Sequence, residues 1–271
     1  MKYADLHLHT VFSDGTYTPA ELVTEALNKN LAAISVADHD TVAGIEPSIE
    51  AAKSKDIEII PGIELSAEYD SHEVHILGYF IDYKSKTLIQ RLAVLQEIRA
   101  NRIYKIVDKL KKIGLKLKVQ SVFDIAGSGT PSRMHVARAM VKEGLVNSIY
   151  EAFEKYIGDK SPAYTCGFRL SPQEAIQLIK GSGGIAVLAH PYLINDDAFI
   201  PRLVEYGLGG LEVYYPEHTQ AMVNFYLGLA RQHNLAVTGG SDFHGQAKPQ
   251  VGVGAIKIPY ELVEALKKIR P

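Results

Sequence analysis

The sequence has one cysteine, Cys166, and no tryptophan. One cysteine cannot form an intrachain disulfide, so a disulfide-built secreted fold is excluded and a reducing cytoplasm is expected. No stretch approaches the roughly 20 consecutive apolar residues of a membrane span. The opening MKYADLHLHT also lacks the apolar run of a signal peptide. We therefore expect a cytoplasmic protein that has no membrane partner.

A strong charge of either sign is also lacking. The chain carries 29 lysines and arginines against 31 aspartates and glutamates, for a net charge of -2. This balance gives no global field that would attract nucleic acid or an anionic membrane, so any affinity for phosphate must be local. Hydrophobic residues make up 46% of the 271 residues. That composition predicts one large domain, or one domain with an insertion.

Short apolar segments alternate with amphipathic segments, which is typical of βα units in a parallel sheet. Capping-box sequences at Thr18–Glu21 and Ser171–Glu174, each with proline at the first helical position, predict two helix starts. The predicted strands cover residues 3–8, 31–36, 57–65, 73–80, 185–189, 211–214 and 235–238. Seven strands favour a smaller, irregular barrel over the eightfold kind, which needs about 250 residues.

The alternation of short apolar strands with amphipathic helices stops between residues 98 and 166. This segment predicts a long basic helix through Lys112, followed by short helices near 132–143 and 148–156. We interpret it as a helical insertion that caps the substrate site. Residues 1–97 and 167–271 then form the barrel.

Histidines and carboxylates gather where the predicted strands end, which is where parallel α/β folds build their sites. Any one of them also fits a structural role, but burying all of them without metal would leave many polar groups unpaired. Nitrogen and oxygen ligands suit zinc, manganese or iron. Nine are too many for one tetrahedral ion and suit two or three divalent ions that share a carboxylate. The candidates are His7, His9, Asp14, His39, Glu64, His75, His190, Asp242 and His244.

The order and spacing of these motifs resemble the PHP (polymerase and histidinol phosphatase) superfamily. The motifs are Asp5–Thr10 with Ser13–Gly15, Ala37–Asp40, Pro61–Glu64, His75–Tyr79, Ala189–Pro191 and Gly240–His244. The resemblance implies a distorted (β/α)7 barrel with a trinuclear centre. Within this superfamily, the sequence is similar to the phosphoesterases that carry a helical insertion. These include nucleoside 3′,5′-bisphosphate phosphatases and exonucleases that trim RNA from its 5′ end.

The resemblance also implies how the ligands divide. His7, His9, Glu64 and Asp242 would surround one ion, and Glu64 would bridge to a second ion held by His75 and His190. Asp14, His39 and His244 would hold the third. Clustered metals activate a water as hydroxide and clamp the phosphate oxygens.

Asp38 and Asp40 could orient His39, and Asp40 could instead assist proton transfer to the leaving group. His39 and His244 are alternatives for that proton role.

The insertion contains a candidate substrate contact. Ser132, Arg133 and His135 stand at a predicted helix start, where phosphate is favoured and arginine adds bidentate binding. An exposed arginine and a locally satisfied histidine are the alternative. The basic residues between Arg99 and Lys118 could meet a polyanion or form a solvated helix face. Glu212 could support the site or be a structural acid at a strand end.

The leading functional hypothesis is hydrolysis of a phosphate ester on a nucleotide or at the 5′ end of short RNA. A small metabolite such as histidinol phosphate is a close rival. Amidohydrolases also place an HxH motif after the first barrel strand, although the carboxylate on strand three and the final DxH argue against that class. A non-catalytic metal-binding module is the third alternative.

Overall fold

The computed structural model describes residues 1–70, 72–165 and 170–270. Cys166 and the predicted end of the insertion lie outside the described residues. Within those residues, no helix combines the length and the apolar character needed to cross a membrane.

The described strands form one continuous sheet in the order β7-β6-β5-β4-β3-β2-β1-β8, which curls into a nearly closed barrel. The strands are β1 (Tyr3–Leu8), β2 (Ala33–Val36), β3 (Glu58–Tyr69), β4 (His72–Tyr79), β5 (Ile185–Leu188), β6 (Gly210–Tyr214), β7 (Ala236–Gly239) and β8 (Ile258–Pro259). The first seven match the predicted strands. The eighth pairs antiparallel with β1 and consists of two residues, too few for a periodic pattern in the sequence.

The gap between β7 and β1 is bridged by the loop that follows β7. Phe243 forms a parallel bridge with Leu8, and the His9 backbone N–H donates to the Phe243 carbonyl at 3.0 Å. A Cβ at Gly240 would lie 2.4 Å from the backbone nitrogen of His7, so only glycine allows this approach. The bridge therefore brings the Asp242 loop against the end of β1.

Strand β4 departs from the expected parallel arrangement. It pairs antiparallel with both β3 and β5, because β3 and β4 form a hairpin without an intervening helix. The parallel expectation was wrong for this strand. His75 nevertheless pairs opposite Ser66 in β3, two residues beyond Glu64, so the antiparallel direction still brings it to the ligand-bearing end.

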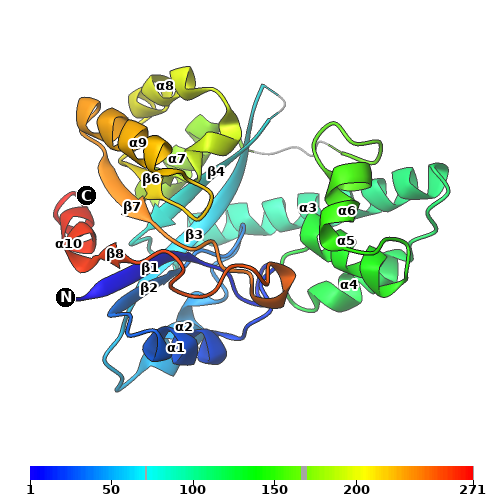
Figure 1. Cartoon of the computed structure of the whole chain (residues 1–271), viewed down its shortest axis with the longest axis horizontal. Coiled ribbons are helices and arrows are strands. Elements are labelled where there is room, and N and C mark those ends of the chain that lie inside the picture. The colour runs from blue at the N-terminus through cyan, green and yellow to red at the C-terminus, as the bar shows by residue number, and fades with distance from the viewer. Residues whose placement is uncertain (71, 166–169, 271) are drawn as a thin grey trace.

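Helices surround the barrel or group to one side of it (Figure 1). They are α1 (Pro19–Asn28), α2 (Ile45–Ala52), α3 (Lys86–Lys112), α4 (Val119–Ala126), α5 (Arg133–Lys142), α6 (Ile149–Ala152), α7 (Pro172–Gly181), α8 (Ile200–Glu205), α9 (Gln220–Gln232) and α10 (Tyr260–Lys268). Both predicted capping boxes are present at the starts of α1 and α7. Short single-turn segments η1 (Phe153–Ile157), η2 (Pro191–Ile194), η3 (Asp197–Phe199) and η4 (Gly245–Ala247) complete the chain.

Helix α3 joins two hydrophobic cores. It begins at Lys86, twelve residues before the predicted insertion, and its first half buries Leu88, Leu92 and Leu95 in the barrel core. Its second half packs Ile103, Ile106 and Leu110 against α4, α5 and α6 in a separate core. Figure 1 shows these helices grouped to one side of the barrel, with α3 as the link.

Candidate metal centre

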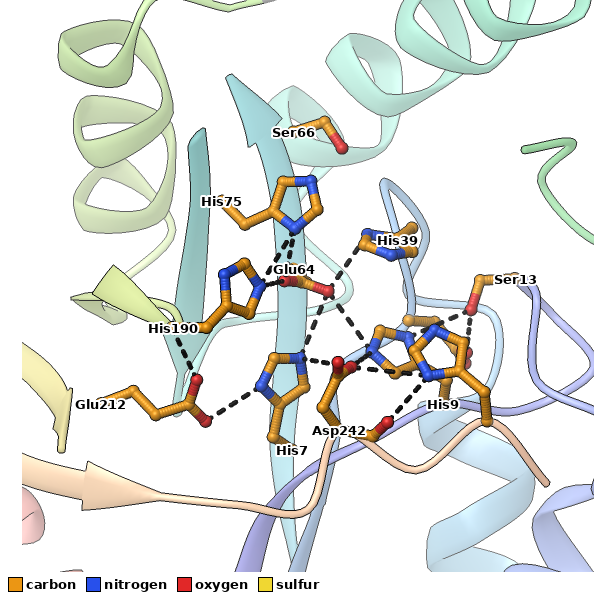
Figure 2. A network of polar contacts seen from close by, with 12 residues as sticks. His7, His9, Ser13, His39, Glu64, Ser66, His75, His190, Glu212 and Asp242 are labelled. Atoms are coloured by element: carbon orange, nitrogen blue, oxygen red, sulfur yellow. Dashed lines mark hydrogen bonds and ion pairs between the residues drawn. The ribbon is translucent and has the colours of Figure 1, made fainter. Parts of the chain in front are cut away.

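The nine predicted ligands converge at one end of the barrel. Strands β1, β3 and β4 supply His7, Glu64 and His75, and the other six follow β1, β2, β5 and β7 in loops. Figure 2 shows Glu64 at the centre of this cluster with imidazoles on several sides. All nine are largely buried, and the His75 side chain, 17% exposed, is the most open of them to solvent.

The Glu64 carboxylate faces five imidazoles, and its two oxygens face different sets of them. These are His39 Nδ1, His7 Nε2 and His9 Nε2 at 3.1, 3.3 and 3.3 Å from Oε2, and His75 Nδ1 and His190 Nε2 at 2.8 and 3.1 Å from Oε1. A carboxylate placed in this way can bridge two cations, one on each oxygen.

Three overlapping groups bring potential ligand atoms within 4.8 Å of one another. They are His7, His9, Glu64 and Asp242; His39, Glu64 and His75; and His9, Asp14, His39 and His244. Glu64, His9 and His39 each belong to two groups. Imidazole and carboxylate in this mixture suit zinc, manganese or iron.

Several atoms of the cluster are buried without a hydrogen-bond partner among the described residues: His7 Nε2, Asp14 Oδ1, His39 Nδ1 and Glu64 Oε2. A buried polar atom left in this state costs about 1–3 kcal/mol. Glu64 Oε2 lies 3.3 Å from His7 Nε2 and 3.1 Å from His39 Nδ1, and Asp14 Oδ1 lies 3.4 Å from His244 Nε2. A divalent cation would bind these unpaired nitrogen and oxygen atoms, so the residues fit a metal site.

The electrostatics of the cluster favour ionised carboxylates. Burial alone would raise the pKa of Glu64, but the neighbouring His39, His75 and His7 hold it well below its usual range. Burial would lower the pKa of His75, but Glu64 and Glu73 raise it to about 10. Any metal bound here must displace the proton from His75, so metal affinity should rise with pH.

Two of the nine candidate ligands hold the backbone in the left-handed region without being glycine. His190 has φ 26° and ψ 63°, and Asp242 has φ 51°. Such conformations cost of the order of 1–3 kcal/mol each and persist when the surroundings fix them. In this site the Glu212 carboxylate accepts from the His190 backbone N–H at 2.8 Å.

Glu212 also contacts the ring of His7. Its Oε1 lies 3.0 Å from His7 Nδ1, and the glutamate is fully buried. If Nδ1 carries the proton that it donates to Glu212, the Nε2 lone pair is left to face Glu64 and Asp242. Of the two roles weighed for Glu212, the geometry favours support of the site.

A lysine that the sequence analysis did not single out lies beside Asp242. Lys248 Nζ donates to Asp242 Oδ2 at 2.9 Å, and the Tyr215 hydroxyl donates to the same oxygen at 2.8 Å. The other oxygen, Oδ1, lies 3.1 Å from His9 Nε2. Asp242 is thus fixed on one side and directed at the cluster on the other. Lys248 stands four residues after His244, in a loop whose path the sequence does not specify.

The predicted partners of His39 are engaged elsewhere. Asp38 accepts hydrogen bonds from Thr10 and Ser13, and Asp40 accepts from Arg99 Nε at 2.5 Å and the Ser66 N–H at 3.0 Å. Neither carboxylate hydrogen bonds His39 in the described chain, so the idea that they orient this ring was wrong. Both Asp40 oxygens therefore already accept a hydrogen bond, Oδ2 from Arg99 and Oδ1 from Ser66. Sequence reasoning placed Arg99 in a basic helix face and gave it no such contact.

The predicted substrate contacts in α5 have different surroundings. Ser132 caps the helix and donates its backbone N–H to His135 Nδ1 at 3.0 Å. His135 is 1% exposed, and burial lowers its pKa to about 4. Arg133 instead donates to Glu73 Oε2 at 2.6 Å and to Asp159 Oδ1 at 2.7 Å. The sequence analysis missed Glu73, although its spacing of two from His75 in a strand was a usable signal.

A cavity of about 690 Å³ opens over the cluster. Its walls combine cluster residues with Arg99, Arg102, Ser132 and Arg133 from the insertion and Lys248 from the last loop. His135 does not line it. Beyond Arg99 and Arg102, the basic run from Lys105 to Lys118 is largely exposed on the outside of the insertion. The cavity thus brings three arginines and a lysine above an imidazole-rich and carboxylate-rich floor, although Glu73 and Glu217 also line it. Such cationic side chains can bind phosphate oxygens.

The barrel and its buried ligand cluster define a metal-dependent hydrolase. The PHP domain family matches residues 5–157. The 5′-3′ exoribonuclease Rnm of Escherichia coli is 34% identical over 257 residues, which cover 92% of this chain and 87% of that protein. The 3′,5′-nucleoside bisphosphate phosphatase of Chromobacterium violaceum is 31% identical, with coverage of 94% and 91%.

A solved structure from Bifidobacterium adolescentis, proposed to be a metal-dependent phosphoesterase, superposes with a TM-score of 0.90. It is 31% identical, and the match covers 97% of this chain and 94% of that one. The chain belongs to the PHP domain family, which confirms the resemblance in its motifs. Its class is that of the metal-dependent phosphoesterases.

Proposed function

We propose that this protein hydrolyses phosphate esters of nucleotides of the AMP or 3′,5′-bisphosphate type, or the phosphodiester at the 5′ end of short RNA. The observation that carries the proposal is the cavity directly above the three ligand groups, which is lined by three arginines and Lys248. The similar proteins from Escherichia coli and Chromobacterium violaceum are named for an RNA and a nucleotide substrate, and the match to each spans most of both chains. Those names favour phosphate esters over the amides of an amidohydrolase.

We assign two to three divalent ions, of manganese, zinc or iron, to the cluster. His7, His9, Glu64 and Asp242 would hold one, and Glu64 would reach a second with His75 and His190. Asp14, His39 and His244 would hold a third. The last set shares its space with His9, since all four residues belong to one group of close ligand atoms. Bound ions would supply Lewis acidity toward the phosphate oxygens and lower the pKa of water.

The residues around the ions have separate tasks in this proposal. Glu212 holds the His7 ring and the His190 backbone in place, and Tyr215 and Lys248 fix Asp242. His39 or His244 would pass a proton to the leaving oxygen if the third ion is absent. Asp40, held by Arg99, is a weaker candidate for that step.

Arg133 provides the contact with the substrate phosphate. Its guanidinium lines the cavity and already binds two carboxylates, those of Glu73 and Asp159. A phosphate presents the same bidentate geometry as a carboxylate and carries more charge, so it can replace Asp159 as a partner. The Asp159 side chain is 53% exposed, which makes its release inexpensive.

Hydrolysis of a panel of esters tests the proposal, measured as released phosphate for the monoesters and as released mononucleotide for the RNA. The panel contains AMP, a nucleoside 3′,5′-bisphosphate, a short 5′-phosphorylated RNA and histidinol phosphate, each with added manganese. A second panel contains hydantoins and lactones. We expect turnover of the nucleotide or RNA esters, and elemental analysis should find two to three metal ions per chain. Activity confined to the second panel would refute the phosphoesterase assignment, and activity confined to histidinol phosphate would refute the nucleotide assignment.

A further inference from the structure

The cavity extends beyond the metal cluster to a region that the proposed chemistry does not use. Among the described residues, exposed large hydrophobic side chains are few and most are scattered over the surface. Tyr150, 73% exposed, and Leu193, 52% exposed, are different because both line this one cavity. Two such side chains on the walls of a substrate cavity indicate a subsite for a flat apolar group.

On one side of the cavity a series of contacts leads from the cluster to Phe153, three residues after Tyr150. Glu73 Oε1 lies 3.2 Å from His75 Nε2, and Glu73 Oε2 accepts from Arg133. The Arg133 guanidinium lies 5.8 Å from the centre of the Phe153 ring. Phe153 follows Tyr150 by three residues, a spacing that places both on one face of a helix. The wall therefore presents, in order, metal ligands, a cation and an aromatic ring.

Hydrogen bonds hold the backbone around Tyr150, whereas its side chain is mostly exposed. Ser148 Oγ accepts from the Glu151 N–H at 3.0 Å, and Glu151 accepts from both Asn147 and Lys155. These bonds fix the turn on each side of Tyr150. An exposed ring on a fixed backbone is a stacking platform that loses little entropy when a base binds.

The other wall starts at a candidate metal ligand. Leu193 lies in η2, three residues after His190, and its neighbour Tyr192 also lines the cavity. Both walls thus begin at the cluster and end in an exposed apolar side chain. A nucleotide has the same order of parts, with its phosphate at one end and its flat base at the other.

We propose that Tyr150 and Leu193 form a nucleobase subsite that selects nucleotides over other phosphate esters. This inference rests on the proposed function and deepens it by assigning the part of the site that reads the base. The contact is by stacking and apolar packing, so it accepts any of the four bases.

The test compares a nucleoside 3′,5′-bisphosphate with the same ribose bisphosphate lacking the base. We expect Tyr150→Ala to raise KM for the nucleotide roughly 5- to 150-fold, the range for loss of one base stack, with kcat nearly unchanged. KM for the abasic ester should not change. Tyr150→Phe should keep the wild-type KM, and Leu193→Ala should repeat the Tyr150→Ala pattern more weakly. Tyr104→Ala is the matched control, since Tyr104 is 54% exposed on α3 and does not line the cavity.

The outcomes separate the two proposals. Wild-type turnover of the nucleotide with an unchanged KM in Tyr150→Ala would overturn the base subsite and leave the proposed function in place. An equal rise in KM for both esters would also overturn it, because the residue would then act on the phosphate or on folding. A wild-type enzyme that hydrolyses neither of these esters, nor AMP, nor the 5′-phosphorylated RNA, would overturn both proposals.

Discussion

Replacing Glu212 with glutamine tests how the cluster is held in a metal-binding state. The carboxylate receives two donors, the His190 backbone N–H at 2.8 Å and the His7 ring at Nδ1, 3.0 Å away. A glutamine side chain has one acceptor oxygen, and its NH2 group would face the other donor. If that NH2 group faces His7, its N–H lies opposite the Nδ1–H of the ring, and both are donors. The ring must then tolerate this repulsion or carry its proton on Nε2 instead.

Moving the proton removes the lone pair that faces Glu64 and Asp242, where the first ion is proposed to bind. Disturbing a residue that orients a metal ligand typically costs 10–100-fold in metal affinity. That is about 1.4–2.8 kcal/mol, since each tenfold change is worth about 1.4 kcal/mol. Glu212 is fully buried, so solvent screening should not reduce this effect.

The assay is calorimetric titration of manganese into protein stripped by a chelator. We expect Glu212→Gln to bind manganese 10–100-fold more weakly and to recover most of its activity at saturating manganese. Glu264→Gln, on an exposed position of α10, is the matched control and should bind as the wild type does. An affinity within twofold of wild type would refute the reasoning. A loss of turnover that manganese cannot restore would show that Glu212 acts on the substrate instead.

Three further predictions concern the metals and α5. Glu64→Gln and Asp242→Asn should each reduce phosphate release by about 100-fold or more at saturating manganese, because each removes a charge from a metal site; near-normal turnover in both would contradict the cluster. Chelation should lower the thermal unfolding midpoint and manganese should restore it, since a ligand at 100 times its Kd stabilises the folded state by about 2.7 kcal/mol. A midpoint that does not change with manganese would contradict metal binding. The pKa of His135 is about 4 in the folded chain and 6.5 ordinarily, so as the pH falls the unfolded chain binds the proton at a higher pH than the folded chain does. The free energy of unfolding therefore decreases as the pH falls below 6.5, by about 2 kcal/mol at pH 5. His135→Gln keeps an acceptor for the Ser132 N–H, and urea unfolding should show a smaller loss between pH 7 and 5 than in wild type; an identical loss would exclude His135 as the cause.

The parts of the site that the sequence predicts are those that obey local rules. An HxH pair on a strand points both rings to one side, and strand ends in a parallel sheet meet at one edge. Those two rules are enough to bring His7, His9, Glu64 and Asp242 together. The capping boxes are predictable for the same reason, because each depends on four consecutive residues.

The parts that the sequence does not predict depend on contacts between distant segments. Lys248 reaches Asp242 through the path of a loop, and Arg99 reaches Asp40 from a helix 59 residues further along the chain. The antiparallel direction of β4 follows from the hairpin and not from the composition of the strand itself. The sequence analysis gave no start for the helix through Lys112, and the structure begins α3 at Lys86.

The continuity of α3 has an evolutionary and engineering consequence. One uninterrupted helix supplies Leu92 to the barrel and Ile106 to the insertion, so no hinge separates the two parts along this connection. A deletion that removed the insertion at residue 98 would cut the helix and remove Arg99 from its contacts with Asp40 and Ser66 in the barrel. The insertion can therefore change its contacts with substrates by point substitution far more readily than it can be lost or exchanged as a unit.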